Sequence, residues 1–161
     1  MKVAIFSDTH DNMALFKKGI DFCKKEGIKT VIHAGDIIAP FLIRCFGNDY
    51  SKFNFTAVFG NNDGEQVFLK KTFGTIYFPP HFFEIDGKKI ALTHVPEHLD
   101  FEKTDAGIII YGHTHEIDVK KENGKLIINP GECCGYLTGN PTFAILDTDN
   151  LEVEIINLNE K

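Results

Sequence analysis

Hydrophobic and polar positions alternate along the first half of the chain in a way that predicts strands followed by helices. Residues 3–6 form a short apolar run, and the pattern then predicts a helix over residues 12–26, which Gly27 would end. The apolar positions of this helix repeat at i, i+4 and i+7, at Phe16, Ile20 and Cys23. Strands are expected at residues 31–32 and 53–59 and a short helix at residues 65–71. The first half therefore resembles one layered unit with a parallel sheet.

The second half shows shorter apolar runs separated by turn sequences. Runs at 82–85 and 89–93 flank Asp86-Gly87, which is a strong hairpin signal. Further strands are expected at the buried run 108–111, on both sides of the turn Asn123-Gly124, and at the alternating run 151–155. The sheet in this half is expected to be antiparallel or mixed.

Two facing sheets with helices outside them would bury all of these runs. The predicted fold class is α/β, a four-layer αββα sandwich of two mixed β-sheets flanked by helices. The length of 161 residues and the hydrophobic content of 43% fit one domain over residues 1–161.

Composition narrows the classes of partner and the cellular compartment. Seventeen basic residues against 23 acidic ones give a net charge of −6 without long runs of like charge, which argues against a nucleic-acid groove or an anionic membrane surface as a large ligand. No h-region follows Met1 and no apolar run approaches the roughly 20 residues of a membrane span, so a cytoplasmic location is expected. The four cysteines are unevenly spaced and include an adjacent pair, so we expect reduced thiols.

Polar signatures follow the apolar runs at five places. They are Ser7-Asp8-Thr9-His10, Gly35-Asp36, Gly60-Asn61-Asn62-Asp63, His94 and Gly112-His113-Thr114-His115. Ligands of an open α/β sheet collect at the carboxyl ends of its strands, so these side chains can converge. Asp, His and Asn side chains at the carboxyl ends of these strands are suitable ligands for a pair of divalent metal ions that catalyse hydrolysis.

Each signature alone is also compatible with an ordinary turn or helix cap. Five of them in one small domain are much harder to explain in that way. We interpret Asn12 as the helix cap, and His33 and His81 as satisfied core or surface histidines. The segment 131–135 is interpreted as either a pocket loop or a plain turn.

The order Asp-x-His, Gly-Asp, Gly-Asn-x-Asp, a lone His and Gly-His-x-His resembles the calcineurin-like metallophosphoesterase family. The resemblance covers nearly the whole chain, and Asn129-Pro130-Gly131 after the last motif is similar to the small single-domain phosphodiesterases of that family. It implies a binuclear site with seven ligand positions. One metal would be held by Asp8, His10 and His115 and the other by Asn61, His94 and His113, with Asp36 as the bridge.

Such a site suits hydrolysis of small phosphodiesters by a metal-bridging hydroxide, because two dications lower the pKa of water and clamp the phosphoryl oxygens. Nitrogen and oxygen ligands without thiolate fit Mn, Fe, Ni or Zn better than Ca. The sequence does not choose among them, nor does it fix the oligomeric state, so homo-oligomerisation stays open.

One position departs from the family pattern. Many members carry His where this chain has Asn62, and an amide cannot act as a general acid at neutral pH. The resemblance therefore implies a preference for esters with good leaving groups, such as aryl phosphodiesters. His98 is the candidate that would supply the missing proton.

Three other functions remain open from the sequence. One is a phosphomonoesterase of the same fold, and another is a binuclear hydrolase that cleaves a different bond, such as an amide. The third is a non-catalytic metal-binding scaffold for protein interaction, similar to the retromer-type subunit of the same fold, in which the metal site is degraded. All seven ligand positions are filled here, which favours an enzyme.

Overall fold

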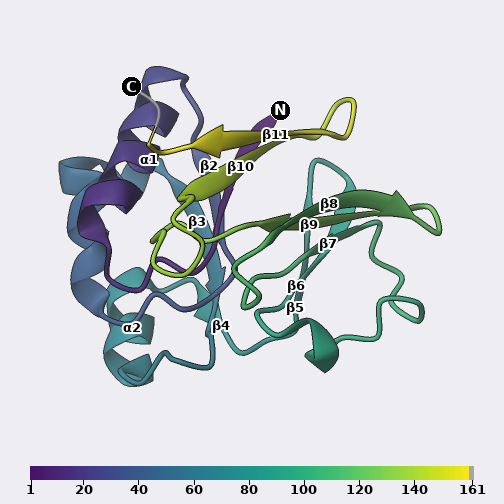
Figure 1. The fold of residues 1–161 in the computed structure, drawn as a ribbon, viewed down its shortest axis with the longest axis horizontal. Coiled ribbons are helices and arrows are strands. Elements are labelled where there is room, and N and C mark those ends of the chain that lie inside the picture. Colours follow the sequence, from purple (N-terminus) through teal and green to yellow (C-terminus); the bar gives the residue numbers. More distant parts are fainter. Residues whose placement is uncertain (160–161) are drawn as a thin grey trace.

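The computed structural model describes residues 1–159 and contains two β-sheets that lie face to face (Figure 1). In chain order the elements are β1 Lys2–Phe6, α1 Met13–Lys25, β2 Thr30–His33, the 3₁₀ segment η1 Pro40–Lys52, β3 Asn54–Val58, α2 Gln66–Phe73, β4 Ile76–Tyr77, β5 His81–Ile85, β6 Lys88–Leu92, the 3₁₀ turn η2 Pro96–His98, β7 Ile108–Ile110, β8 Ile117–Glu122, β9 Lys125–Pro130, β10 Thr142–Asp147 and β11 Glu152–Asn157.

Both sheets are mixed, as the sequence predicted. The first has the order β11-β10-β1-β2-β3-β4, with β1 to β4 parallel and β10 antiparallel to both of its neighbours. The second has the order β5-β6-β7-β9-β8, with parallel pairs in the middle and an antiparallel pair at each edge. The predicted α/β sandwich class is confirmed, and the last two strands return to the first sheet.

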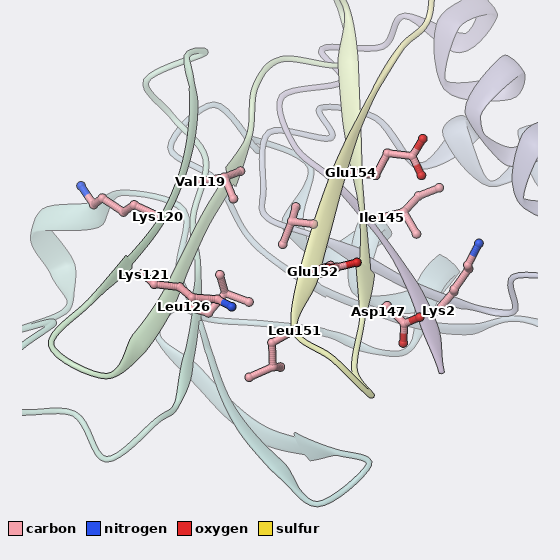
Figure 2. Close-up of a pocket in the computed structure, with 11 residues that line it drawn as sticks. Lys2, Val119, Lys120, Lys121, Leu126, Ile145, Asp147, Leu151, Glu152 and Glu154 are labelled. Carbon is pink, nitrogen blue, oxygen red and sulfur yellow. The ribbon is translucent and has the colours of Figure 1, made fainter.

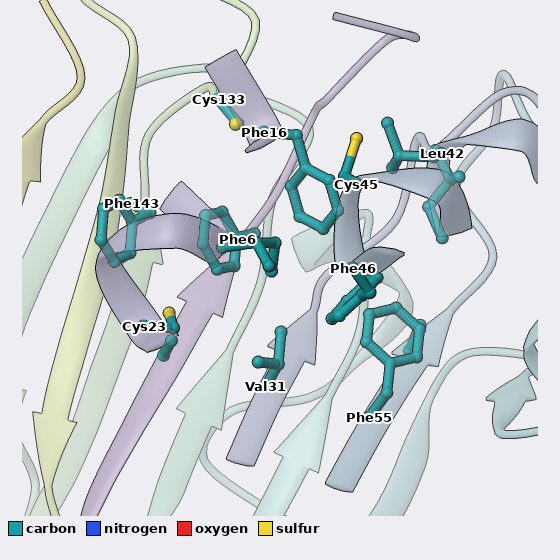
Figure 3. Packing of buried hydrophobic residues seen from close by; sticks show 14 of the residues in the cluster. Phe6, Phe16, Cys23, Val31, Leu42, Cys45, Phe46, Phe55, Cys133 and Phe143 are labelled. Carbon is teal, nitrogen blue, oxygen red and sulfur yellow. The ribbon is translucent and has the colours of Figure 1, made fainter. Parts of the chain in front are cut away.

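The helices cover the outer face of the first sheet (Figure 1). Phenylalanines dominate the core between them, where Phe6 stacks on Phe143 with ring centroids 4.6 Å apart and meets Phe16 edge to face (Figure 3). Stacked and edge-to-face pairs are the favoured arrangements of aromatic rings. The same core contains the buried thiols of Cys23, Cys45 and Cys133.

A second core lies between the two sheets and consists of aliphatic side chains. It includes Val3 and Ile5 of β1, Ile90 and Leu92 of β6, and Ile128 of β9. Alternate residues of β1 therefore serve opposite cores, as the period of two in a strand requires. The outer face of the second sheet is covered by the segment after η2, whose Leu99 and Phe101 pack against Ile109, Tyr111 and Ile127.

The first predicted helix agrees closely with α1. Asn12 accepts a hydrogen bond from the Leu15 N–H, which confirms the interpretation of Asn12 as the cap, and Gly27 follows the helix with φ 70°. The second predicted helix is α2, which runs two residues past Lys71. The segment η1 was missed, because its pattern is broken by Gly47, whose φ of 62° interrupts the helical backbone.

The two predicted turns both join antiparallel strands. Asp86 and Gly87 have φ of 54° and 71° between β5 and β6, and Asn123 and Gly124 have φ of 50° and 77° between β8 and β9. Two consecutive left-handed residues are the signature of the tightest hairpin turns. Among residues 1–159, no helix is both long and apolar enough to cross a bilayer, and all four cysteines are free and buried.

Candidate metal centre

The predicted ligands lie at the ends of strands from both sheets and meet where the two sheets face each other. From the first sheet come Asp8 and His10 after β1, Asp36 after β2 and Asn61 after β3, and from the second come His94 after β6 and His113 and His115 after β7. Direct contacts link the two sheets here: for example, His94 Nε2 lies 3.3 Å from Asp36 Oδ2, and the His113 N–H donates to Asp8 Oδ2 at 3.1 Å.

Asp8 and Asp36 are the buried centre of this cluster, with exposures of 0% and 1%. His10 Nε2 lies 3.8 Å from Asp8 Oδ1 and 3.5 Å from Asp36 Oδ2. His115 Nε2 lies 3.4 Å from Asp8 Oδ1. On the other side, His94 Nε2 contacts Asn61 Oδ1 at 2.9 Å. Imidazole nitrogens thus approach each carboxylate from several directions.

Two polar atoms of the cluster are buried without any hydrogen-bond partner among the described residues, Asp8 Oδ1 and His10 Nε2. A buried polar atom left unpaired costs about 1–3 kcal/mol, so such atoms call for an explanation. Ligand atoms of Asp8, His10 and His115 lie within 4.8 Å of one another, and so do those of Asp8, Asp36 and His94. These residues fit divalent metal ions, which would satisfy both orphaned atoms.

Electrostatics in the cluster favour charged carboxylates and protonated imidazoles. Burial opposes ionisation of Asp36, but contacts with His94 and hydrogen bonds from Asn62 outweigh it and hold its pKa well below the usual value. Burial likewise opposes ionisation of Asp8, and His10, His94 and Ser7 lower its pKa. The carboxylate of Asp8 raises the pKa of His10, and Asp36 and Asp8 overcome burial to raise that of His94.

The backbone around the ligands is strained. Five of the seven predicted ligands have a positive φ: Asp8 at 50°, His10 at 40°, Asp36 at 57°, His113 at 68° and His115 at 62°. A left-handed conformation costs a residue other than glycine roughly 1–2 kcal/mol. Such strain collects at functional sites, where the surrounding structure holds it.

Two positions must be glycine because the loops at the strand ends approach each other closely there. A Cβ on Gly112 would lie 1.9 Å from Ser7 Oγ, and a Cβ on Gly60 would lie 2.1 Å from Asp36 Oδ1. Contacts below 3.0 Å are not found for real Cβ atoms. Any side chain at these two positions would push a strand-end loop away from a central carboxylate.

Two neighbours of Asn61 hold the Asp36 loop in place. Asn62 donates to Asp36 from its backbone N–H at 2.8 Å and from its side-chain amide at 2.7 Å. Asp63 accepts from the N–H groups of Asp36, Ile38 and Gly60. The sequence shows Asp63 as the last residue of the Gly60-Asn61-Asn62-Asp63 signature, but only the structure shows that its carboxylate accepts from three backbone N–H groups.

The mouth of the site is formed by exposed residues. Asn61, Asn62 and His113 are all exposed, so a solute can reach them. His98 is exposed in η2, where its N–H donates to Val95 O, and among the described residues no hydrogen bond or ion pair joins its side chain to the cluster. The proposed catalytic roles of Asn62 and His98 stay predictions.

The histidines interpreted as structural have structural partners. His33 is fully buried, accepts from the Gly35 N–H at Nδ1 and contacts Thr9 Oγ1 through Nε2, and burial lowers its pKa to about 3. His81 is half-buried and stacks on Tyr77 with centroids 3.8 Å apart. Both interpretations are confirmed.

Sequence reasoning missed Glu132, which lies between β9 and β10 and is 0% exposed. Its Oε2 lies 2.6 Å from His115 Nδ1. The segment 131–135 was interpreted as a pocket loop or a plain turn, and the structure shows that it lines the cluster. The sequence offered one signal for a role of Glu132. Its carboxylate stands next to two cysteines in a short segment bounded by glycines, where a charged side chain exposed to solvent is not expected.

A hollow of about 600 Å³ lies elsewhere on the surface. Figure 2 shows its lining side chains on either side of β11, with Val119, Lys121 and Leu126 on one side and Lys2 and Asp147 on the other. None of the seven predicted ligands contributes to it.

A protein-family model and two named relatives match this chain over nearly its whole length. The family model described as a calcineurin-like phosphoesterase superfamily domain matches residues 1–151. Phosphodiesterase MJ0936 of Methanocaldococcus jannaschii is 41% identical over 167 residues, which cover 98% of this chain and 99% of the relative. Phosphodiesterase YfcE of Escherichia coli K12 is 26% identical over 98% of this chain and 93% of the relative.

Solved structures show the same fold. The structure of an archaeal phosphodiesterase superimposes with a TM-score of 0.86 at 39% identity, over 98% of this chain and 99% of that one. A single mutant of Vps29 from Entamoeba histolytica gives a TM-score of 0.71 at 21% identity, over 99% of this chain and all of that one. The latter likeness concerns the fold alone.

Proposed function

The chain belongs to the calcineurin-like phosphoesterase superfamily, and from this premise we propose that it hydrolyses small phosphodiesters at a centre of two divalent metal ions. The observation that carries the proposal is the pair of orphaned buried atoms, Asp8 Oδ1 and His10 Nε2, inside a ring of nitrogen and oxygen ligands. Two relatives that match this chain nearly end to end are named phosphodiesterases.

Asp36 is the residue best placed to serve both ions. Its Oδ2 lies 3.5 Å from His10 Nε2 and 3.3 Å from His94 Nε2, so one carboxylate oxygen stands between the two proposed ligand sets. One ion would be held by Asp8, His10 and His115 and the other by Asn61, His94 and His113. Bound divalent ions would supply an acidified water and charge neutralisation of the phosphoryl oxygens.

The chain's own residues would bind and orient the ester. Asn61, Asn62 and His113 are exposed at the mouth, where amide and imidazole N–H groups can donate to phosphoryl oxygens. Asn62 has no proton to give to the departing oxygen at neutral pH. We therefore expect the rate to favour aryl phosphodiesters, whose leaving groups depart without protonation, with His98 as the candidate acid if one acts.

The test combines metal content with hydrolysis of bis-aryl and mono-aryl phosphates by the same preparation. We expect close to two transition-metal ions per chain, hydrolysis of the diester that exceeds that of the monoester, and loss of both activities in chelator. A matched pair of variants, Asp36→Asn at the centre and Asp118→Asn outside it, controls for general effects of removing a carboxylate. Full diesterase activity in metal-stripped protein, or an inert protein with both metals bound, would overturn the proposal.

The identity of the metal, the cytosolic location and any self-association stay predictions from the sequence. A mixture of Mn, Fe, Ni and Zn offered at equal concentration would show which the ligand set prefers, and divalent affinity generally rises from Mn to Ni in this series.

A further inference from the structure

Glu132 is a buried carboxylate that the proposed metal centre does not use as a ligand. It is 0% exposed and lies in the segment that carries the chain from β9 in the second sheet to β10 in the first. A buried acid without partners would be costly to keep ionised. The hydrogen-bond partners of Glu132 therefore indicate its role.

Both oxygens of Glu132 are occupied by donors. Oε1 accepts from the Thr138 N–H at 2.6 Å, the Thr138 hydroxyl at 2.7 Å and the Leu137 N–H at 3.0 Å. Oε2 accepts from the Cys134 thiol at 3.1 Å and lies 2.6 Å from His115 Nδ1. Because backbone N–H groups can only donate, these contacts identify the carboxylate as an acceptor.

The donors around both Glu132 oxygens decide whether a third group of residues binds a metal ion or only forms hydrogen bonds. Ligand atoms of His115, Glu132 and Cys134 lie within 4.8 Å of one another, which is close enough for a further metal ion. An ion there would displace hydrogen bonds that already satisfy Glu132, and the Cys134 thiol has its pKa raised to about 12 by burial and by Glu132. Hydrogen bonding to His115 explains the arrangement without an additional ion.

The segment that holds Glu132 is fixed to the same strand end that supplies Asp8. The Cys133 N–H donates to Ser7 O at 2.9 Å, and the Cys134 N–H donates to Asp8 O at 3.1 Å. The Asn12 side chain donates to Cys134 O at 3.0 Å. Glu132 is therefore placed relative to Asp8 by backbone contacts of the two residues that follow it.

An acceptor at Nδ1 decides which nitrogen of His115 carries the proton. Because both oxygens of Glu132 already accept from other donors, Nδ1 of His115 is the donor in this contact and Nε2 keeps its lone pair. That lone pair faces Asp8 Oδ1, 3.4 Å away, which is one of the two orphaned atoms. His94 is oriented in a similar way, but its Nδ1 faces the neutral Ala34 O at 2.7 Å.

We propose that Glu132 is a positioning residue that fixes the ring orientation and the tautomer of His115, so that Nε2 is presented as a metal ligand. The proposal deepens the proposed function and rests on it for the identity of the ligand. A carboxylate behind a ligating histidine makes the imidazole more basic, and loss of such a partner typically lowers metal affinity about 10–100-fold. Glu132 itself would touch neither metal nor substrate.

Glu132→Gln tests this because glutamine has one oxygen and one NH₂ group. The Thr138 and Leu137 donors around Oε1 would keep the amide oxygen on their side. The NH₂ group would then face His115 and donate to Nδ1, which moves the ring proton to Nε2. The variant keeps the shape of the loop and reverses the tautomer.

The measurement is ¹⁵N NMR of the imidazoles in metal-free protein at a pH of about 8.5, where a histidine of ordinary pKa is neutral. We expect the Nδ1–H form of His115 in the wild type and the Nε2–H form in Glu132→Gln. Calorimetric titration with Mn²⁺ should show affinity lowered about 10–100-fold in the variant. Thr138→Val is the matched control, because it removes one donor to Glu132 and leaves the contact with His115 intact.

An Nε2–H tautomer in the wild type would overturn the proposal even if the variant failed to fold. So would lower affinity in Glu132→Gln with an unchanged tautomer, or an equal loss in Thr138→Val, because each would mean that Glu132 only supports the loop. None of these measurements uses turnover. An inactive protein with the expected tautomers would refute the proposed function and leave the positioning role standing.

Discussion

Gly60→Ala adds one methyl group at the point where the β3 loop touches Asp36. Gly60 does not have a positive φ, so alanine suits its backbone and the effect is purely steric. The new Cβ would lie 2.1 Å from Asp36 Oδ1 and 2.3 Å from the Asp36 backbone nitrogen, whereas ordinary contact begins at 3.4 Å. The loops must therefore separate by about 1.3 Å, and because one contact is with backbone, a change of rotamer cannot relieve it.

The separation predicts two separate losses. Overpacking of this kind costs about 1–3 kcal/mol of stability, which lowers the melting temperature by roughly 2–12 °C for a chain of this size. Misplacement of a catalytic group by about 1 Å costs on the order of 100-fold in rate. We expect melting of the metal-free protein to show the first loss, and Mn²⁺ titration and hydrolysis of a bis-aryl phosphate to show the second.

Gly64→Ala provides the matched control, because it lies in the same loop and its Cβ would meet no atom within 4 Å. It should behave as the wild type in all three assays. If Gly60→Ala binds Mn²⁺ and hydrolyses the diester within about threefold of Gly64→Ala, the placement of Asp36 against Gly60 does not matter. The central role given to Asp36 would then be wrong.

Four further predictions follow from the same contacts. A chelator should abolish hydrolysis, and added Mn²⁺ or Ni²⁺ should restore it. Asp36→Ala should lose well over about 100-fold in kcat/KM, because it removes the carboxylate oxygen proposed to serve both metal ions. Asn62→His should flatten the dependence of rate on leaving-group pKa in a series of phosphodiesters, since a general acid is worth about 100–10,000-fold where proton transfer limits the rate; a flat dependence in the wild type would instead point to another acid. Because the pKa of Glu132 is lowered to about 2 from 4.5, its contribution to stability is present above pH 4.5 and is lost as the pH falls towards 2, so urea unfolding of Glu132→Gln should depend less on pH across that window. Lys125→Met should lower the urea unfolding free energy by about 1–3 kcal/mol, because Nζ donates to three backbone carbonyls of residues 101–104; unchanged stability would show that these bonds are replaced by water.

The sequence predicted the elements whose signals are local. The helix α1 has a cap at Asn12, one apolar stripe and a stop at Gly27, and all three act within the same few turns. The hairpin at Asp86-Gly87 is equally local. The segment η1 was missed because its structure depends on packing of Leu42 and Phe46 into the core rather than on a repeating pattern.

The residues predicted as ligands could be found from the sequence because each of them directly follows an apolar run. What the sequence could not give is the geometry that depends on long separations in the chain. Asp8 meets His113 across 105 positions, and Asp63 holds Asp36 across 27. Glu132 was missed for the same reason, since its charge has meaning only beside His115 and Thr138.

The two sheets contribute proposed metal ligands that neither sheet could bring together alone. Asp8 and Asp36 belong to the first sheet and His94 and His115 to the second, so the centre exists only when the aliphatic core between the sheets has formed. The strained backbone at five ligand positions is held by that same docking. A metal ion that binds only the docked form must stabilise it, by about 4 kcal/mol at a free concentration a thousand times the Kd. If the chain binds metal as proposed, metal binding and the joining of the two sheets are one coupled equilibrium, in which the ion would offset the strain and the burial of charge that the proposed ligands impose on the folded chain.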